Sequence, residues 1–499
     1  MSATSPPAAR GSHGSDGPAP DSGVEVGVRA PTMTPRQLGA LIVLLGAQFM
    51  LAVDFSILNV ALPDVGRGLD FSLHNLQWVA TAFALPAAGF TLLFGRVADV
   101  VGRRRLFMTG LVLLGVSSLL GGLAGSPGTL LTARVVQGLA TAMAMPAAMS
   151  LLTTTFGEGP LRTRALGLSG ALLSAGFTAG SVLGGVLTDL LSWRWTFLVN
   201  VPVVVALVIA APLLLTESRA SDRVRLDVPG AVTVSGGLLA LVYGATRAGE
   251  QGWTDPVTVV VLVLAVVLLV AFARIEARAP QPLAPIRILT RRSVSWGNLG
   301  GLVTFSMMTA VVFLTTLYLQ NVLGYSPLAT GMTFAGTGVV AFLGGVFAPR
   351  IIARVGRRVA LASGLAVQAL FTAPLMFLSD RDGDILLLLV VCSVAAFGHL
   401  VAIVAFTVTA TSGLPNEDQG LATGLASMTQ QVGMTIGIPI MSAIATARTE
   451  TLAADHSAQD AFLGGLRYAL AANTAIVVVG AVLVWFFLKP RAGVAREKA

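Results

Sequence analysis

The sequence predicts an all-α membrane protein, and three observations support that prediction. Of its 499 residues, 55% are hydrophobic and only 11% are charged, whereas soluble domains carry roughly 25% charged residues. Apolar runs of the about 20 residues that a helix needs to cross a bilayer recur along most of the chain. The polar segments between these runs alternate between arginine-rich and arginine-poor. A lipid bilayer is therefore the expected solvent for most of this chain.

We expect fourteen spanning helices separated by short polar loops. Their predicted centres lie near Leu51, Leu85, Leu114, Ala142, Ala175, Val205, Leu238, Leu264, Phe305, Ala341, Leu365, Ala396, Thr435 and Ile476. An even number of spans places both termini on the same side of the membrane.

Arginine placement predicts which side that is. The arginine-rich set of loops holds Arg103, Arg104, Arg105, Arg162, Arg164, Arg219, Arg223, Arg225, Arg274, Arg278, Arg287, Arg291, Arg292, Arg350, Arg354, Arg357 and Arg358. Because positively charged loops stay in the cytoplasm, both termini are expected to be cytoplasmic. The formal net charge of +8 then reflects topology and contact with anionic membrane lipid, and no nucleic-acid partner is expected.

Composition and internal repetition divide the chain into five parts. Residues 1–36 are rich in Pro, Gly, Ser and Ala and lack an apolar segment, so we expect a disordered cytoplasmic tail. The element Gly95–Arg105, after the second predicted span, resembles Phe347–Arg358, after the tenth. If the two spans between about Val228 and Phe272 are an insertion, both copies follow the second helix of a six-helix half. The predicted parts after the first tail are a six-helix bundle at 37–217, a two-helix insertion with linkers at 218–290, a six-helix bundle at 291–489 and a cytoplasmic tail at 490–499.

Residue types exclude several kinds of chemistry. The only lysines, Lys489 and Lys498, lie within the last eleven residues, so the chain has no P-loop lysine and no ATP is expected as a partner. The four histidines lack metal-ligand spacing, and no nucleophile–base motif accompanies them. The single cysteine, Cys392, cannot form an intramolecular disulfide. We therefore expect no enzyme, no metal and no cofactor, and any pumping must use an ion gradient.

Asp54 is the most informative residue for function, because it lies inside the apolar run Leu51–Pro63. A charged aspartate at mid-helix costs about 2.5–3.5 kcal/mol of insertion free energy, so it requires a partner, a water-filled cavity or a proton. At 1.5 Å of rise per residue, Asp54 lies roughly 12 Å and Arg134 roughly 8 Å below the outer membrane boundary. We interpret Asp54 as a proton carrier whose ionisation is favoured by Arg134 and opposed by desolvation. A static buried ion pair between the two residues is the alternative.

Several segments carry a resemblance to a known family. Gly95–Arg105 resembles its cytoplasmic motif between helices 2 and 3, and Leu131–Gly138 resembles its helix 4 motif with a buried arginine. Gly176–Gly185 resembles the glycine-rich helix 5 motif of exporters, and Leu51–Pro63 resembles the helix 1 motif of one branch. Trp193–Pro202 adds a further signature of that branch. Together they resemble the major facilitator superfamily, specifically its fourteen-span drug:proton antiporter family.

The resemblance implies two six-helix bundles plus two extra central helices, in a multi-pass protein of the cytoplasmic membrane. It implies export of lipophilic drugs or antibiotics in exchange for protons, with the proton gradient as the energy source. The expected partners are a small lipophilic substrate, protons and membrane lipid. A proton symporter or facilitator that imports a small organic nutrient is the alternative, because one fold supports both directions. A sensor that has lost transport is a third class, but such a chain should have lost its buried charges.

The resemblance also implies a conformational latch at the cytoplasmic face. A carboxylate at Asp99, about one helical turn from Gly102 and Arg103, can make a charge-assisted bond that forms in one state and breaks in the other. The expected latch residues are Gly95, Asp99, Gly102, Arg103 and Arg104. The second copy of the element has Ala353 where Asp99 stands in the first, so only the first copy retains the carboxylate.

The helix 5 motif contributes four glycines, Gly176, Gly180, Gly184 and Gly185. They permit close packing against a neighbouring helix, and plain helix packing is also their simplest interpretation. Ser181 stands where the family usually has proline, so the motif here does not imply a proline-dependent kink or gate.

A substrate cavity is expected at the membrane midplane between the two halves, mostly apolar with a few polar anchors. The candidate anchors are Asn59, Gln77, Asn200, Gln320, Gln430 and Gln431. Each of them could instead only hydrogen-bond a neighbouring helix. Because Asp54 is the only clear mid-span carboxylate, neutral or singly charged lipophilic compounds are favoured over dications.

Overall fold

The computed structural model describes residues 33–71, 78–218, 227–279, 282, 286–325, 327–380, 383–415 and 418–488. Residues Met33–Ala499 form one compact unit, and the description below concerns its described part. Gln77, most of the predicted N-terminal tail and the whole predicted C-terminal tail lie outside the described residues, as do the side chains of Asn59 and Ser181.

All regular elements among the described residues are helical. The first group is α1 (Pro35–Gly68), α3 (Trp78–Gly89), α4 (Thr91–Val101), α5 (Arg103–Gly122), α6 (Pro127–Thr155), α7 (Pro160–Leu190), α8 (Trp195–Leu198) and α9 (Asn200–Leu214). A pair follows, α10 (Val228–Gln251) and α11 (Pro256–Glu276), and then the short α12 (Ile286–Leu289). The last group is α13 (Arg292–Leu317), a π-helical segment Tyr318–Val322, α14 (Pro327–Thr372), a 3-10 segment Ala373–Phe377, α15 (Asp384–Thr411), α16 (Gln419–Leu452) and α17 (Ala458–Phe487).

Polar caps explain where several helices begin. The side chains of Thr34, Ser126, Asp227, Asp255 and Ser457 each accept a hydrogen bond from a backbone amide in the first turn of the helix that follows. Four of these five helices also carry proline in the first turn, where its missing N–H would have had no helical partner. The boundaries are therefore set by local chemistry rather than by the membrane alone.

Twelve described helices are long and apolar enough to cross a membrane, or up to thirteen when the bent pair α3–α4, with an angle of 49° between its helices, counts as one span. The predicted centres Ala341 and Leu365 both fall in α14, which is 46 residues long. Helical conformation inside α14 breaks at Gly356, with φ 80° and ψ 162°. The all-helical membrane fold is thus confirmed, whereas the exact count of fourteen stays a prediction.

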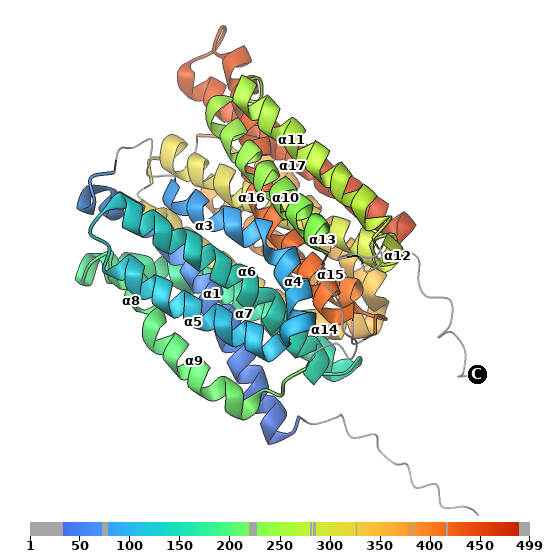
Figure 1. The fold of residues 1–499 in the computed structure, drawn as a ribbon. Coiled ribbons are helices and arrows are strands. Elements are labelled where there is room, and N and C mark those ends of the chain that lie inside the picture. Colours follow the sequence, from blue (N-terminus) through green and yellow to red (C-terminus); the bar gives the residue numbers. More distant parts are fainter. Residues whose placement is uncertain are drawn as a thin grey trace, which may run out of the picture. The chain divides into compact units, whose positions relative to one another are not determined.

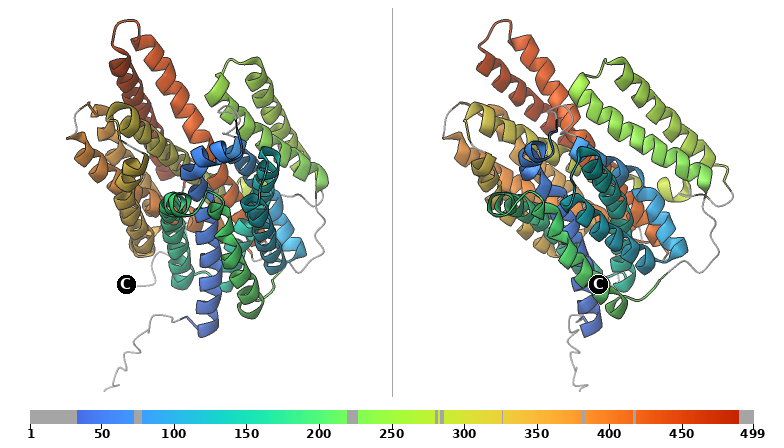
Figure 2. Two further views of the ribbon diagram at one scale, coloured as in Figure 1. Left: turned by 90° about the vertical axis from the view of Figure 1, so that its left-hand side faces the viewer. Right: turned by 60° about the vertical axis from the view of Figure 1, so that its left-hand side comes forward.

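The helices pack as two groups joined along one seam (Figures 1 and 2). In the first group α1 packs on α7, and α6 packs on α5 and α3; in the last group α14 packs on α15 and α17, and α16 on α13 and α17. Across the seam, α4 contacts α16 and α7 contacts α14. The pair α10–α11, light green in Figure 2, packs through α10 on both α3 and α16.

Buried apolar side chains tie α10 into that seam. One buried cluster contains Leu92 of α4, Val234 and Leu238 of α10, and Leu421 and Leu425 of α16. Lipid tails are as apolar as these side chains, so tight van der Waals packing, rather than exclusion of water, holds helices together in a bilayer. α10 is therefore a packed part of the seam between the groups.

Gly356→Ala should destabilise the protein by about 1–3 kcal/mol, because the φ and ψ of Gly356 belong to a region that is essentially restricted to glycine. No atom lies within 4 Å of a Cβ added at Gly356, so backbone strain is the only expected cause. The thermal midpoint of detergent-solubilised protein measures the effect. Gly331→Ala is the matched control, since Gly331 lies in the same helix with equal space and no positive φ. Equal midpoints for the two variants would contradict the assignment of a break at Gly356.

Candidate functional site

The two charges that the sequence analysis placed at similar depth meet in the structure. Asp54 on α1 is 1% exposed and Arg134 on α6 is 3% exposed. Arg134 Nη1 lies 3.8 Å from Asp54 Oδ2, which is an ion pair but too long for a direct hydrogen bond. The opposite charges are therefore close enough to stabilise each other, but no direct hydrogen bond joins the two side chains.

Two amide side chains supply the hydrogen bonds that Asp54 accepts. Asn200 Nδ2 donates to Asp54 Oδ1 at 2.5 Å, and Gln137 Nε2 donates to the same oxygen at 3.2 Å. Both amides also donate to the hydroxyl oxygen of Ser118, at 3.2 and 3.0 Å respectively. Among the described residues, no hydrogen-bond donor reaches Asp54 Oδ2. One carboxylate oxygen is thus held by protein donors, and the other accepts no hydrogen bond from the described residues.

Gln137 also connects Asp54 to Arg134. Its Oε1 accepts a hydrogen bond from Arg134 Nη1 at 3.0 Å, while its Nε2 donates to Asp54. Arg134 Nε donates to the carbonyl oxygen of Val79 at 3.0 Å, and the guanidinium lies 4.4 Å from the centre of the Phe83 ring. Arg134 therefore keeps three favourable contacts that do not depend on the charge of Asp54.

The sequence analysis identified Asp54 and Arg134 but not the network around them. Asn200 was expected as an anchor in the substrate cavity, and in the structure its side chain donates to Asp54; its role in binding substrate stays a prediction. Gln137 lies within the helix 4 motif Leu131–Gly138 but was not predicted as a site residue, and neither was Ser118. Gln137 could have been found, because it lies three residues after Arg134 and so on the same helix face. Nothing in the sequence marks Ser118.

Three of the other candidate cavity anchors lie in the last group of helices. Gln320 lies in the π-helical segment after α13, and Gln430 and Gln431 lie on α16; all three are half-buried. Their role in binding substrate stays a prediction, as does that of Asn59 and Gln77.

The latch motif forms a buried charge cluster between α4 and α5. Arg103 donates to Asp99 Oδ1 from Nη2 at 2.8 Å and from Nε at 3.1 Å. Arg96 Nη1 lies 3.9 Å from the other oxygen of Asp99. Gly102, with φ 118°, makes the sharp turn that brings α5 back towards Asp99. These four residues therefore lie together, and Arg96 joins the expected latch residues Asp99, Gly102 and Arg103; their action as a latch stays a prediction.

Asp99 also reaches across the seam to the start of α16. The Asp99 carboxyl packs directly against the backbone of Gly420, because a Cβ added at Gly420 would lie 2.1 Å from Asp99 Oδ1. A Cβ added at Gly95 would lie 2.7 Å from the Cα of Gly424, one turn further along α16. Only glycines permit this approach of α4 to α16.

Arg104 has a different contact from the rest of the motif. Its backbone amide donates to Glu217 Oε1 at 3.1 Å, and its Nη1 donates to the carbonyl oxygen of Leu215 at 3.1 Å. The amide of Arg105 donates to the second oxygen of Glu217 at 3.2 Å. Arg104 therefore fixes the chain after α9 to the start of α5. These bonds lie within the first group of helices, unlike the contact of Asp99 with α16. The sequence analysis missed Glu217.

A second polar connection crosses the seam at the start of α7. Arg162 is 5% exposed, and its Nη2 donates to the carbonyl oxygen of Thr411 and to Gln419 Oε1, both at 3.1 Å. Nearby, the backbone amide of Gly413 donates to the carboxylate of Glu158. The sequence analysis used Arg162 only to assign topology, because its partners lie about half the chain away.

The helix 5 glycines lie on α7 against α1. Cβ atoms added at Gly176, Gly180 and Gly184 would lie within 2.7 Å of backbone carbonyl oxygens of α1, and Gly185 is half-buried beside them. The close helix packing that the motif predicts is therefore present.

Comparison with known proteins identifies the family. The model of the Major Facilitator Superfamily matches residues 44–438. The puromycin resistance protein of Streptomyces alboniger is 37% identical over 93% of each chain, and the cephamycin export protein of Amycolatopsis lactamdurans is 38% identical over 85% of this chain and 89% of its own. The lincomycin resistance protein of Streptomyces lincolnensis is 30% identical over 81% of this chain and 83% of its own.

A solved structure gives the same assignment at the level of the fold. The human organic anion transporter MFSD10 matches with a TM-score of 0.66 at 15% identity, covering 90% of this chain and 100% of that one. At this identity the likeness concerns the fold alone. Since the family model spans most of the chain and the relatives are similar along most of their length, this multi-pass membrane protein belongs to the Major Facilitator Superfamily.

Proposed function

We propose that this chain exports lipophilic drugs or antibiotics in exchange for protons. The observation that carries the proposal is the buried carboxylate of Asp54, which has one oxygen fixed by amides and one open to a proton. Relatives named for puromycin resistance, cephamycin export and lincomycin resistance support export of antibiotic-like compounds. A membrane potential supplies about 2.3 kcal/mol per elementary charge per 100 mV, before any contribution from the pH difference.

We infer fourteen spans with both termini in the cytoplasm. The bent pair α3–α4 adds one span to the twelve single helices, and the break at Gly356 divides α14 into two segments. The arginine-rich loops support the orientation. This count supports two six-helix bundles at 37–217 and 291–489, separated by the insertion at 218–290.

The proton step follows from the contacts of Asp54. In its charged form Asp54 is stabilised by Arg134 and by donors from Asn200 and Gln137. When Asp54 takes up a proton, Arg134 keeps Gln137 and the carbonyl oxygen of Val79 as acceptors. Neutralising Asp54 therefore does not leave Arg134 without hydrogen-bond partners, and protonation can follow a small movement of α1 relative to α6.

Alternating access requires the seam to open and close at the predicted cytoplasmic end. In the present state α4 is joined to α16 through Asp99 and Gly420, and α7 is joined to α15 and α16 through Arg162. Both connections must break before substrate can enter from the cytoplasm. In each connection a charged side chain meets a backbone group. Water can replace that backbone group when the seam opens, and the connection can form again when the seam closes.

Asp54→Asn should abolish proton-coupled efflux, because an amide cannot carry the proton. The measurement is uptake of puromycin into everted vesicles, together with the proton release that accompanies it. Asp64→Asn is the matched control, since Asp64 lies on the same helix with a 38% exposed side chain paired to Arg67. If Asp54→Asn retained coupled uptake, the proton role would be rejected. The alternative interpretation of Asp54 and Arg134 as a static ion pair would then stand. Puromycin leaving everted vesicles with protons in wild type would instead indicate import.

Asn200→Ala should shift the pH of half-maximal efflux upward by about 1–2 units, because charged Asp54 loses a hydrogen bond worth about 1.5–3 kcal/mol. The pH profile of puromycin transport in proteoliposomes measures the shift. Asn321→Ala, at an exposed position after α13, is the control. An unchanged profile with reduced maximal rate would mean that Asn200 acts only in packing or in binding substrate.

Gly420→Ala should lower the transport rate about tenfold, because the added Cβ would force Asp99 away from α16. A tenfold change corresponds to about 1.4 kcal/mol of free energy. Gly336→Ala is the control, since no atom lies within 4 Å of its Cβ position. Size-exclusion profiles check that both variants fold. Normal transport by Gly420→Ala would show that contact between Asp99 and Gly420 is not required for the cycle.

A further inference from the structure

A cavity of about 120 Å³ lies beside Arg134. Its walls come from four helices, α1, α3, α6 and α10, and they include Phe55, Leu58, Thr81, Phe83, Arg134 and Thr246. The cavity is similar in size to the engineered apolar cavities of about 150 Å³ that bind benzene. It therefore has room for one aromatic ring but not for a complete drug-sized molecule.

The chemistry of the walls defines what fits there. Phe55 and Phe83 meet edge to face, with ring centroids 5.7 Å apart, and Arg134 is the only charged residue among the lining residues. The guanidinium carries five N–H donors. Two of its nitrogens, Nε and Nη1, donate to Val79 and Gln137, and no hydrogen bond from Nη2 is found among the described residues. An apolar, ring-sized space beside an unused donor fits an aromatic group that bears an oxygen acceptor.

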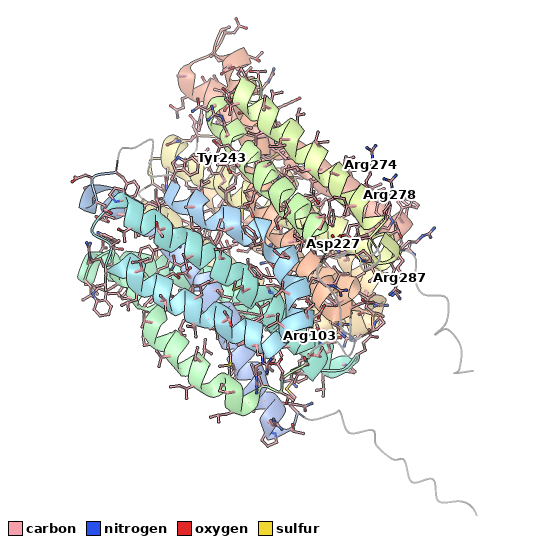
Figure 3. The ribbon with its side chains drawn as sticks, viewed as in Figure 1. Arg103, Asp227, Tyr243, Arg274, Arg278 and Arg287 are labelled. Atoms are coloured by element: carbon pink, nitrogen blue, oxygen red, sulfur yellow. The ribbon has the colours of Figure 1, made fainter. Side chains whose placement is uncertain are left out.

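The fourth wall comes from the α10–α11 pair rather than from either large group of helices. Trp78 of α3 stacks on Tyr243 of α10, labelled in Figure 3, with ring centroids 6.0 Å apart. Thr246 lies three residues further along α10, and its hydroxyl donates to the carbonyl oxygen of Val242 at 2.9 Å. The stack thus holds α10 against α3, with Thr246 facing the cavity.

We propose that this cavity binds the ring-sized, oxygen-bearing lipophilic part of the exported compound. The oxygen accepts a hydrogen bond from Arg134, the ring packs on Phe55 and Phe83, and Thr246 closes the site from α10. The proposal rests on the proposed function, because it treats the occupant as part of the transported compound. It gives the α10–α11 pair a direct role in ligand binding.

Cysteine protection tests occupancy of the cavity without any transport. Thr246→Cys is made in a Cys392→Ala background, because Cys392 is the single native cysteine and is buried. Full-length protein in lipid nanodiscs is alkylated with N-ethylmaleimide, with phenol as the probe and toluene as a probe of similar size without the oxygen. At about four times its Kd, phenol should slow alkylation about fivefold, since protection follows mass action. Toluene should protect much less.

The control places the cysteine on the same helix but away from the cavity. Val232→Cys, at a position 65% exposed on α10, should react at the same rate with and without either probe. Equal effects of phenol at both positions, or no effect at Thr246→Cys, would overturn the proposal. Because no gradient is present, selective protection would stand even if the protein proved not to export drugs or not to use protons.

Filling the cavity tests its part in transport. Thr246→Trp should lower puromycin efflux about tenfold, because the indole occupies the ring-sized space in a packed site. Val232→Trp, which adds the same side chain at an exposed position of α10, should transport at the wild-type rate. Wild-type rates for both variants would contradict a site for the exported compound. If Thr246→Trp fails to fold, the protection experiment decides alone.

Discussion

The burial of one carboxylate and one guanidinium among apolar helices constrains the first group of helices more than any other feature. Each ion costs several kcal/mol to remove from water, and attraction between the two offsets that cost only when further hydrogen bonds satisfy them. Gln137 and Asn200 donate to Asp54, Gln137 and the carbonyl oxygen of Val79 accept from Arg134, and Ser118 on α5 accepts a further bond from each amide. Asp54 therefore fixes how α1, α5, α6 and α9 sit relative to one another. A change in its charge alters hydrogen bonds that involve all four helices.

The contacts inside the first group and the contacts across the seam differ in kind. The helix 5 glycines bring α7 against α1 over several turns, with no charged group involved, which suits a permanent contact. Across the seam, Asp99 packs against the backbone of Gly420, and Arg162 donates to the carbonyl oxygen of Thr411, both at helix ends, where amides and carbonyls lack helical partners. Such bonds can be exchanged for water, which suits a contact that must open and close.

Sequence reasoning succeeded where the cause is local and failed where it is a contact between distant segments. The apolar runs follow from composition alone, and the proximity of Asp54 and Arg134 agrees with the similar depth that helix rise predicts for them. Asn200, 146 residues from Asp54, and Gln419, 257 residues from Arg162, could not be paired with them without knowing how the helices pack. Two spans within α14 were predicted as separate helices, and only the backbone at Gly356 shows how they join.

The position of the α10–α11 pair shows that it is more than a lipid-facing addition. α10 packs on α3 from the first group and on α16 from the last group, so the groups cannot move apart without sliding past α10. Leu238 is buried in this contact at 4% exposure, whereas Val260 and Val266 of α11 are at least 60% exposed. α11 thus presents its valines outward, as a lipid-facing helix does. Since α10 also supplies Thr246 to the cavity beside Arg134, this helix connects the seam directly to that cavity.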